Sequence, residues 1–174
     1  LYLKGYAENY RKAAEQFEKA LKLDAAYSPA ALYLARTYNA LYEQDKAEQY
    51  FRQAIQIDAD YAEARASFAG MLLDTGNVDE AIRQLNTVTG RQPDHAMAHY
   101  LLAQAYRMKD LYAESIDAAG KAIRLMPKNS EAHFWLAESL RMSKKYEPAR
   151  TEYLEYLRLS DFDSKLAGKM NYYV

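Results

Sequence analysis

The chain has 174 residues, half of them apolar, and its 23 Lys and Arg against 24 Asp and Glu give a formal net charge of -1. This length indicates one domain or at most two small ones, and the balanced charge disfavours nucleic acids and anionic membranes as partners. The absence of cysteine excludes disulfides, thiolate metal sites and cysteine nucleophiles, and no apolar stretch approaches the roughly 20 residues that a membrane-spanning helix needs.

Few helix-breaking residues interrupt the chain, since it contains only 6 Gly and 4 Pro, and this composition predicts helices. Residues 1–27 are expected to hold a shortened first helix and a second helix, as a partial or atypical unit. Ser28 followed by Pro29 is typical of a helix start, because serine caps a helix and proline lacks an N–H that would stay unpaired there. This helix is predicted to run to about Leu41, and a second helix follows a short turn, over residues 46–57.

The same helix–turn–helix pattern recurs every 34 residues. Identical residues form two series, Ala30, Ala64, Ala98 and Ala132, and Ala35, Ala69, Ala103 and Ala137; bulky residues form another, Leu34, Phe68, Leu102 and Leu136. Alanine at the contact points lets antiparallel helices approach closely, while larger side chains fill the remaining space. The recurrence predicts full repeats over residues 28–61, 62–95, 96–129 and 130–163, with residues 164–174 beginning a capping or further helix.

This 34-residue pattern, with Leu102, Ala103, Tyr106, Ser115, Ala122 and Pro127 at their spacings, resembles the tetratricopeptide repeat. The resemblance spans nearly the whole chain. It implies an all-α fold, a right-handed superhelical solenoid of antiparallel helix pairs with about five repeats, forming a single domain over residues 1–174. It also implies a non-catalytic scaffold for protein–protein interaction, whose concave groove binds a peptide segment of a partner.

A helical period of about 100° per residue separates the first-helix residues that pack in the core from those that face outward. The predicted peptide-binding residues on the outward side are Leu32, Arg36, Asn39, Leu73, Tyr100, Gln104, Arg107, Met108, Phe134, Glu138 and Arg141. Aromatic, methionine and arginine side chains are enriched at binding hot spots, and guanidinium groups suit a carboxylate or a phosphorylated side chain. The alternative interpretation is that the aromatic and methionine side chains belong to ordinary helix packing.

No residue pattern indicates catalysis or a metal site. His95 and His99 are four residues apart, and His133 has the same place as His99 in the next repeat, but helix packing or surface exposure is the more ordinary role for these histidines. A glycine-rich phosphate loop and a nucleophile elbow are both missing from the sequence. The sequence therefore predicts no enzyme activity, no metal and no cofactor.

The expected partner is another protein or peptide, with no nucleic acid and no membrane insertion. A second hypothesis is self-association within a larger protein, in which uncapped apolar ends of the solenoid meet end to end and form a homo-oligomer. The given residues show no signal peptide, which favours a soluble protein, cytoplasmic by default, but the compartment itself is left open.

Overall fold

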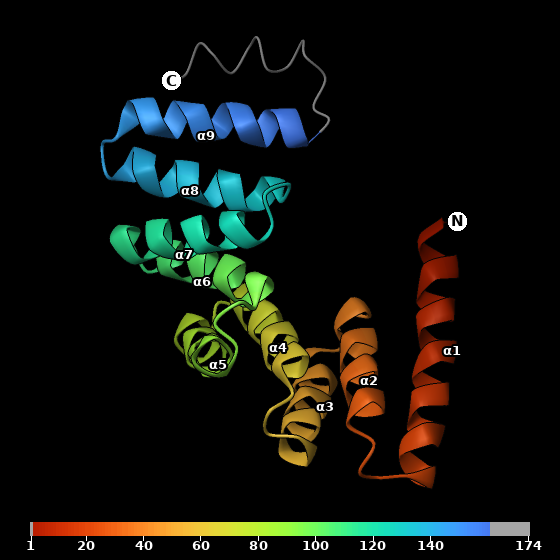
Figure 1. Cartoon of the computed structure of the whole chain (residues 1–174). Helices are drawn as coiled ribbons and strands as arrows, with labels where there is room; N and C mark the ends of the chain where they lie inside the picture. Colours follow the sequence, from red (N-terminus) through yellow and green to blue (C-terminus); the bar gives the residue numbers. More distant parts are fainter. Residues whose placement is uncertain (1, 161–174) are drawn as a thin grey trace. The chain divides into compact units, whose positions relative to one another are not determined.

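The computed structural model describes the backbone of residues 2–160 and the side chains of residues 7–160, and the regular elements of this part are all helices (Figure 1). In chain order they are α1 (Tyr2–Leu23), α2 (Ser28–Ala40), α3 (Gln44–Ile57), α4 (Ala62–Asp74), α5 (Val78–Arg91), α6 (Ala96–Met108), α7 (Tyr112–Leu125), α8 (Ser130–Met142) and α9 (Tyr146–Leu159). The predicted all-α fold is confirmed. Within the described residues, no helix combines the length and the apolar character needed to cross a membrane.

The first helices of the four full repeats begin where the 34-residue period starts each repeat, at Ser28, Ala62, Ala96 and Ser130. The separate shortened helix expected at the start of residues 1–27 is not found, because α1 is one continuous helix. The assignment of these residues to a partial or atypical repeat stays a prediction. The capping role expected of Ser28 is also corrected. Ser28 is the first helical residue, Tyr27 is the cap without a side-chain hydrogen bond, and Pro29 lies in the first turn, where a proline N–H is not needed.

The turns inside the repeats share one backbone conformation. The residues with positive φ in the described chain are Tyr42, Gly76, Asp110 and Lys144, and they are spaced by the repeat period of 34 residues. At three of these turns the N–H of the following residue donates to the carbonyl five residues earlier, at 2.9 Å, as in Glu43 to Tyr38 and Lys145 to Leu140. A left-handed residue followed by such a bond ends a helix sharply, so the second helix of the repeat can return antiparallel to the first.

Contacts between the helices divide the chain into two compact units, Leu1–Thr75 and Gly76–Val174. In the first unit α2 packs against α1, α3 and α4. The core there includes stacked rings of Phe51 and Phe68, with centroids 5.6 Å apart and both side chains almost fully buried.

In the second unit α6 packs against α5, α7 and α8, and α8 packs against α7 and α9. The alanines of the repeat series in this unit are fully buried, among them Ala103 and Ala137, as expected for residues at close helix contacts. The Ser115 hydroxyl donates to the Ala103 carbonyl at 2.7 Å and lies 2.7 Å from the Ser139 hydroxyl, so this buried polar pair is hydrogen-bonded. Small residues therefore set how closely α6, α7 and α8 approach.

Candidate functional site

The predicted site residues of the first unit divide into buried and accessible ones. Leu32 is 0% exposed and Leu73 is 3% exposed, so both belong to the core and their assignment as peptide-binding residues is corrected. Leu32 is enclosed because three helices pack around α2. Leu73 lies on α4, which is apolar around most of its circumference, and a helix of that kind is buried. Arg36 and Asn39 are half-buried.

The guanidinium group of Arg36 is held by the neighbouring first helix. It donates to the Ser67 hydroxyl from Nη2 at 2.6 Å and from Nε at 3.1 Å, and its Nη1 lies 2.9 Å from the carboxylate of Glu63. Arg36 thus links α2 to α4 within the first unit. The side chain is still 39% exposed, and its five N–H donors exceed the three that these contacts use.

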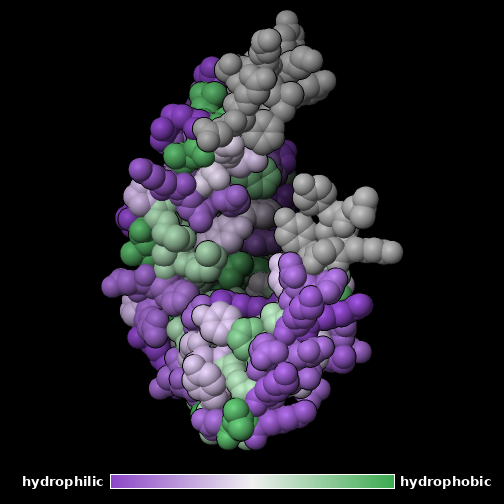
Figure 2. All heavy atoms as spheres, turned by 90° about the vertical axis from the view of Figure 1, so that its right-hand side faces the viewer, coloured by the Kyte–Doolittle hydropathy of each residue, from purple (hydrophilic) through white to green (hydrophobic). Residues whose placement is uncertain are grey.

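In the second unit the remaining predicted residues lie on two first helices that contact one another, α6 and α8. We name this surface the α6–α8 face, and its members are Tyr100, Gln104, Arg107, Met108, Phe134, Glu138 and Arg141. None of these side chains is buried, and Met108 is 43% exposed. Figure 2 shows hydrophobic residues scattered among hydrophilic ones on one side of the molecule. The α6–α8 face therefore offers accessible aromatic, thioether and guanidinium groups together.

Glu138 is the centre of a hydrogen-bonded cluster on the α6–α8 face. Its side chain is 18% exposed and accepts hydrogen bonds from the Tyr153 hydroxyl and from Arg141, whose Nη2 is 3.0 Å away. Nη2 of Arg107 lies 3.8 Å from the same carboxylate. The cluster ties α6, α8 and α9 together through one carboxylate.

The ionisation of this cluster follows from its geometry. Burial raises the pKa of Glu138, but hydrogen bonds from Arg141 and Tyr153 and the positive charges of Arg141 and Arg107 outweigh it, so the pKa lies below its ordinary value. Burial and the hydrogen bond to Glu138 raise the pKa of Tyr153 to about 12. At neutral pH the cluster therefore holds a carboxylate, a neutral phenol and two guanidinium groups.

Arg107 is positioned from several sides. Its guanidinium lies 3.3 Å from the carboxylate of Asp110 and over the ring of Tyr112, 5.6 Å from the ring centroid. Its buried Nε has no hydrogen-bond partner among the described residues. Arg107 is thus oriented by its neighbours, and the unpaired Nε is buried beneath the α6–α8 face and not presented on it.

Phe134 joins the α6–α8 face to an aromatic cluster. Its ring centroid lies 5.1 Å from that of Trp135, 5.4 Å from that of Tyr156 and 6.4 Å from that of Tyr153. Edge-on and tilted ring contacts at these distances are favourable. Phe134 is half-buried by this packing, so it serves both the core and the surface.

The three histidines have structural partners. His95 accepts a hydrogen bond from the Ala98 N–H at 3.1 Å and caps α6, and His99 Nε2 donates to the Pro93 carbonyl at 2.7 Å. His133 lies 2.6 Å from Glu152 through Nδ1 and 3.4 Å from a proline carbonyl through Nε2. Among the described residues, no group of three His, Cys, Asp or Glu side chains is arranged to hold a metal ion.

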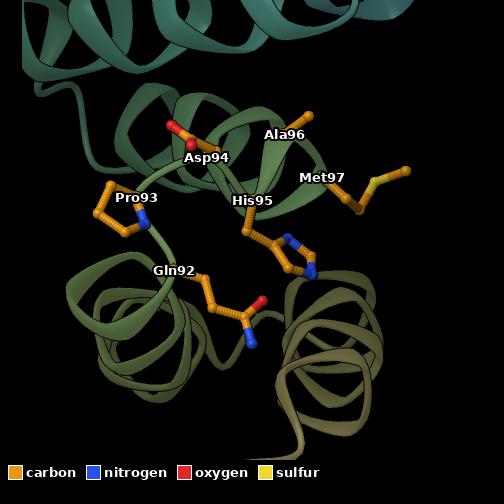
Figure 3. A pocket seen from close by; sticks show the side chains of 6 residues that line it. All are labelled: Gln92, Pro93, Asp94, His95, Ala96 and Met97. Atoms are coloured by element: carbon orange, nitrogen blue, oxygen red, sulfur yellow. The ribbon is translucent and has the colours of Figure 1, made fainter.

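A shallow hollow of about 510 Å³ lies at the connection between α5 and α6. It is lined by Gln92, Pro93, Asp94, His95, Ala96 and Met97. The side chains of Gln92 and His95 extend to the same side of the loop, while Asp94 points the other way (Figure 3). The hollow holds no member of the α6–α8 face, and its histidine is already engaged in capping α6.

Sequence reasoning placed Glu138, Arg141 and Arg107 on one face and missed Tyr153, the fourth member of their cluster. The spacing of three residues between Glu138 and Arg141 signals an ion pair on a helix. Tyr153 is on α9 and faces the cluster from the second helix of the repeat. A helical wheel drawn for α8 alone carries no signal for that contact.

Comparisons with solved structures place this arrangement among known helical-repeat proteins. The chain is similar to a crystal structure of MamA, with a TM-score of 0.78, 20% identity and coverage of 91% of this chain and 92% of that chain. It is similar to PilW, described as a widely conserved type IV pilus biogenesis factor, with a TM-score of 0.82, 22% identity and coverage of 93% and 74%. For pilF of Pseudomonas aeruginosa the TM-score is 0.77, with 21% identity and coverage of 89% and 75%. At these identities the likeness is one of fold.

A comparison with curated proteins found no match. Two family models, both described as tetratricopeptide repeat, match the chain, one over residues 42–105 and the other over residues 2–62 and 112–164. The second model covers more than half of the chain, and the helices repeat with the period that the family requires. The chain therefore belongs to the tetratricopeptide-repeat family and has its helical-solenoid fold.

Proposed function

We propose that the protein is a non-catalytic scaffold that holds a peptide segment of a partner protein on the first helices of its repeats. The tetratricopeptide-repeat fold is typical of such scaffolds. The observation that carries the proposal is the α6–α8 face, where two contacting helices from consecutive repeats present accessible aromatic, methionine and arginine side chains. These are the residue types that dominate binding hot spots.

The mechanism that we propose is preorganisation. The backbone of α6 and α8 is already fixed by helical hydrogen bonds and by packing against α7, so docking a peptide orders few additional groups in the scaffold. Tyr100 and Met108 supply apolar area to the guest. Arg141, with a side chain 46% exposed, can take a guest carboxylate while Glu138 keeps its bond to Tyr153.

The proposal is tested by selecting peptides from a random display library on the full chain and measuring their affinity. Trp135 is the only tryptophan of the sequence and its ring touches Phe134, so its fluorescence reports events at the α6–α8 face. Tyr100→Ala and Met108→Ala are each expected to weaken the selected peptide about tenfold or more, as hot-spot residues do. Tyr146→Ala is the matched control, because Tyr146 is 59% exposed at the start of a second helix. Equal affinity of all three variants and the parent would contradict the proposal.

Self-association through the ends of the solenoid remains a prediction. The segment to which it refers, residues 164–174, lies outside the described residues. Light scattering over a range of concentrations tests it separately from peptide binding. A constant mass at high concentration would remove it.

A further inference from the structure

A hollow of about 420 Å³ runs between α5 and α7 in the second unit and is floored by α6. We name it the α5–α7 groove. Its lining includes His99 and Leu102 of α6 and Glu114, Asp117, Ala118 and Lys121 of α7. By the helical period, His99 and Leu102 lie on the side of α6 opposite to Tyr100 and Gln104. The α5–α7 groove is therefore a different surface from the α6–α8 face.

His99 supplies an unused hydrogen-bonding atom to the α5–α7 groove. The side chain is only 7% exposed, and Nε2 lies 2.7 Å from the Pro93 carbonyl. A carbonyl oxygen only accepts, so Nε2 carries the hydrogen and Nδ1 of the neutral ring is an acceptor. No residue of the described chain hydrogen-bonds Nδ1 of His99. Nδ1 of His99 is not one of the fully buried atoms that lack a partner, so it keeps access to the α5–α7 groove.

The next repeat shows what fills the equivalent space there. His133 occupies the same place as His99, and its Nδ1 donates to the carboxylate of Glu152 at 2.6 Å. The residue 34 positions before Glu152 is Ala118, whose methyl group cannot reach the ring. The α5–α7 groove is thus the space that a side chain of the protein itself occupies in the following repeat, left open here.

The charges around the α5–α7 groove select the kind of guest. Asp117 is paired with Lys121 at 2.7 Å, whereas Glu114 is exposed and has no partner among the described residues. The rim therefore carries one uncompensated negative charge, and the same groove is lined by His99 with its acceptor nitrogen. The apolar floor at Leu102 and Ala118, each 4% exposed, suits the methylene stem of a long side chain.

From these observations we infer that the α5–α7 groove binds an arginine side chain of a partner protein. The guanidinium group donates to Nδ1 of His99 and faces Glu114, while its stem covers Leu102. Arginine fits this combination because one planar group carries several donors and can reach two acceptors at once. The α5–α7 groove would then be a second contact surface, independent of the peptide proposed for the α6–α8 face.

The test is a titration of the full chain with N-acetylarginine amide, followed by NMR of the imidazole of His99 and the backbone amide of Ala118. We expect saturable shifts at both. N-acetylcitrulline amide has nearly the same shape without the charge and is expected to bind several-fold more weakly. N-acetylglutamate amide tests the opposite guest, a carboxylate like that of Glu152, and is expected to give no saturable shift.

Two variants make the test specific. Ala118→Glu supplies the carboxylate that the next repeat has, so it should abolish arginine binding without lowering the unfolding midpoint. Glu114→Gln changes an exposed side chain and should weaken binding about threefold while leaving the fold intact. Tyr100→Ala, on the α6–α8 face, should leave arginine binding unchanged.

Three results would overturn the inference: no shift at His99 with the arginine probe, tighter binding of the glutamate probe, or arginine binding that is unaffected by both groove variants. Because Tyr100→Ala separates the two surfaces, failure here would leave the peptide proposal standing. Failure of the peptide proposal would likewise leave the arginine inference standing.

Discussion

Removal of the Glu138 carboxylate is expected to lower the free energy of unfolding of the second unit by about 2 kcal/mol. The bond from the half-buried Tyr153 hydroxyl contributes about 1.5 kcal/mol, as hydrogen bonds to charged groups do. The pair with Arg141, whose side chain is 46% exposed, adds about 0.5 kcal/mol, because solvent screens it. Arg107, at 3.8 Å, adds little more.

The fluorescence of Trp135 reports the unfolding of the second unit, where Glu138 lies. Trp135 lies on α8, one turn before Glu138, so its fluorescence follows the unfolding of the surrounding helices in urea. Glu138→Ala should lower the urea midpoint with an unchanged slope, which marks a loss of stability. Glu131→Ala is the matched control, because Glu131 is an exposed carboxylate on the same helix, and its effect should stay within about 0.5 kcal/mol. Equal midpoints for the two variants would refute the role of the Glu138 cluster.

The same carboxylate predicts a pH dependence. The pKa of Glu138 in the folded chain lies below its ordinary value of 4.5, so the folded state favours the ionised form. Its contribution is therefore fully present above that ordinary value and is lost as the pH falls through the lower, folded value. The difference in stability between the parent chain and Glu138→Gln should shrink over this acidic range. A difference that stays constant with pH would show that Glu138 acts through packing alone.

Two further predictions concern the core and the turns. Ser115→Ala alone leaves the Ser139 hydroxyl and the Ala103 carbonyl without their shared partner, so it should lower the free energy of unfolding by about 1–2 kcal/mol. The double variant Ser115→Ala with Ser139→Ala should be closer to the parent in urea unfolding. A double variant that loses more free energy of unfolding than the two single variants together would contradict this prediction. Gly76→Ala should lower the free energy of unfolding by about 1 kcal/mol, because φ at this residue is +81°. A new methyl group would meet nothing within 4 Å, so the loss comes from the backbone conformation and not from a clash. Denaturation followed by circular dichroism measures this, and an unchanged midpoint would argue against it.

The fold was predictable because repetition averages out local ambiguity. Each single helix start is a weak signal, but four starts at one interval fix the register, and the helices begin at those residues. The start of the chain has no second copy to compare with, and there the expectation of a shortened helix was wrong, since α1 continues unbroken from Tyr2 to Leu23. The left-handed turn residues also escaped notice, because Tyr42 and Lys144 do not have the side chains that favour positive φ, and Asp110 alone gives too weak a signal.

The candidate site was less predictable, because a helical period gives the direction of a side chain but not what covers it. Leu32 points to the same side as Arg36, yet three neighbouring helices around α2 bury it completely. The sequence identified Glu138 and Arg141 but not Tyr153, which approaches from another helix. Contacts between helices depend on how the helices pack, and the periodicity of one helix does not reveal which residues of its neighbours it meets.

The claim that first helices hold a peptide is tested most directly by mapping where a selected peptide binds. Backbone amide shifts of the full chain should be recorded with and without the tightest peptide from the display selection. Shifts are predicted on α6 and α8, centred on Tyr100, Met108 and Arg141, with α7 and α9 largely unaffected. Shifts confined to α7 and α9 would contradict the account.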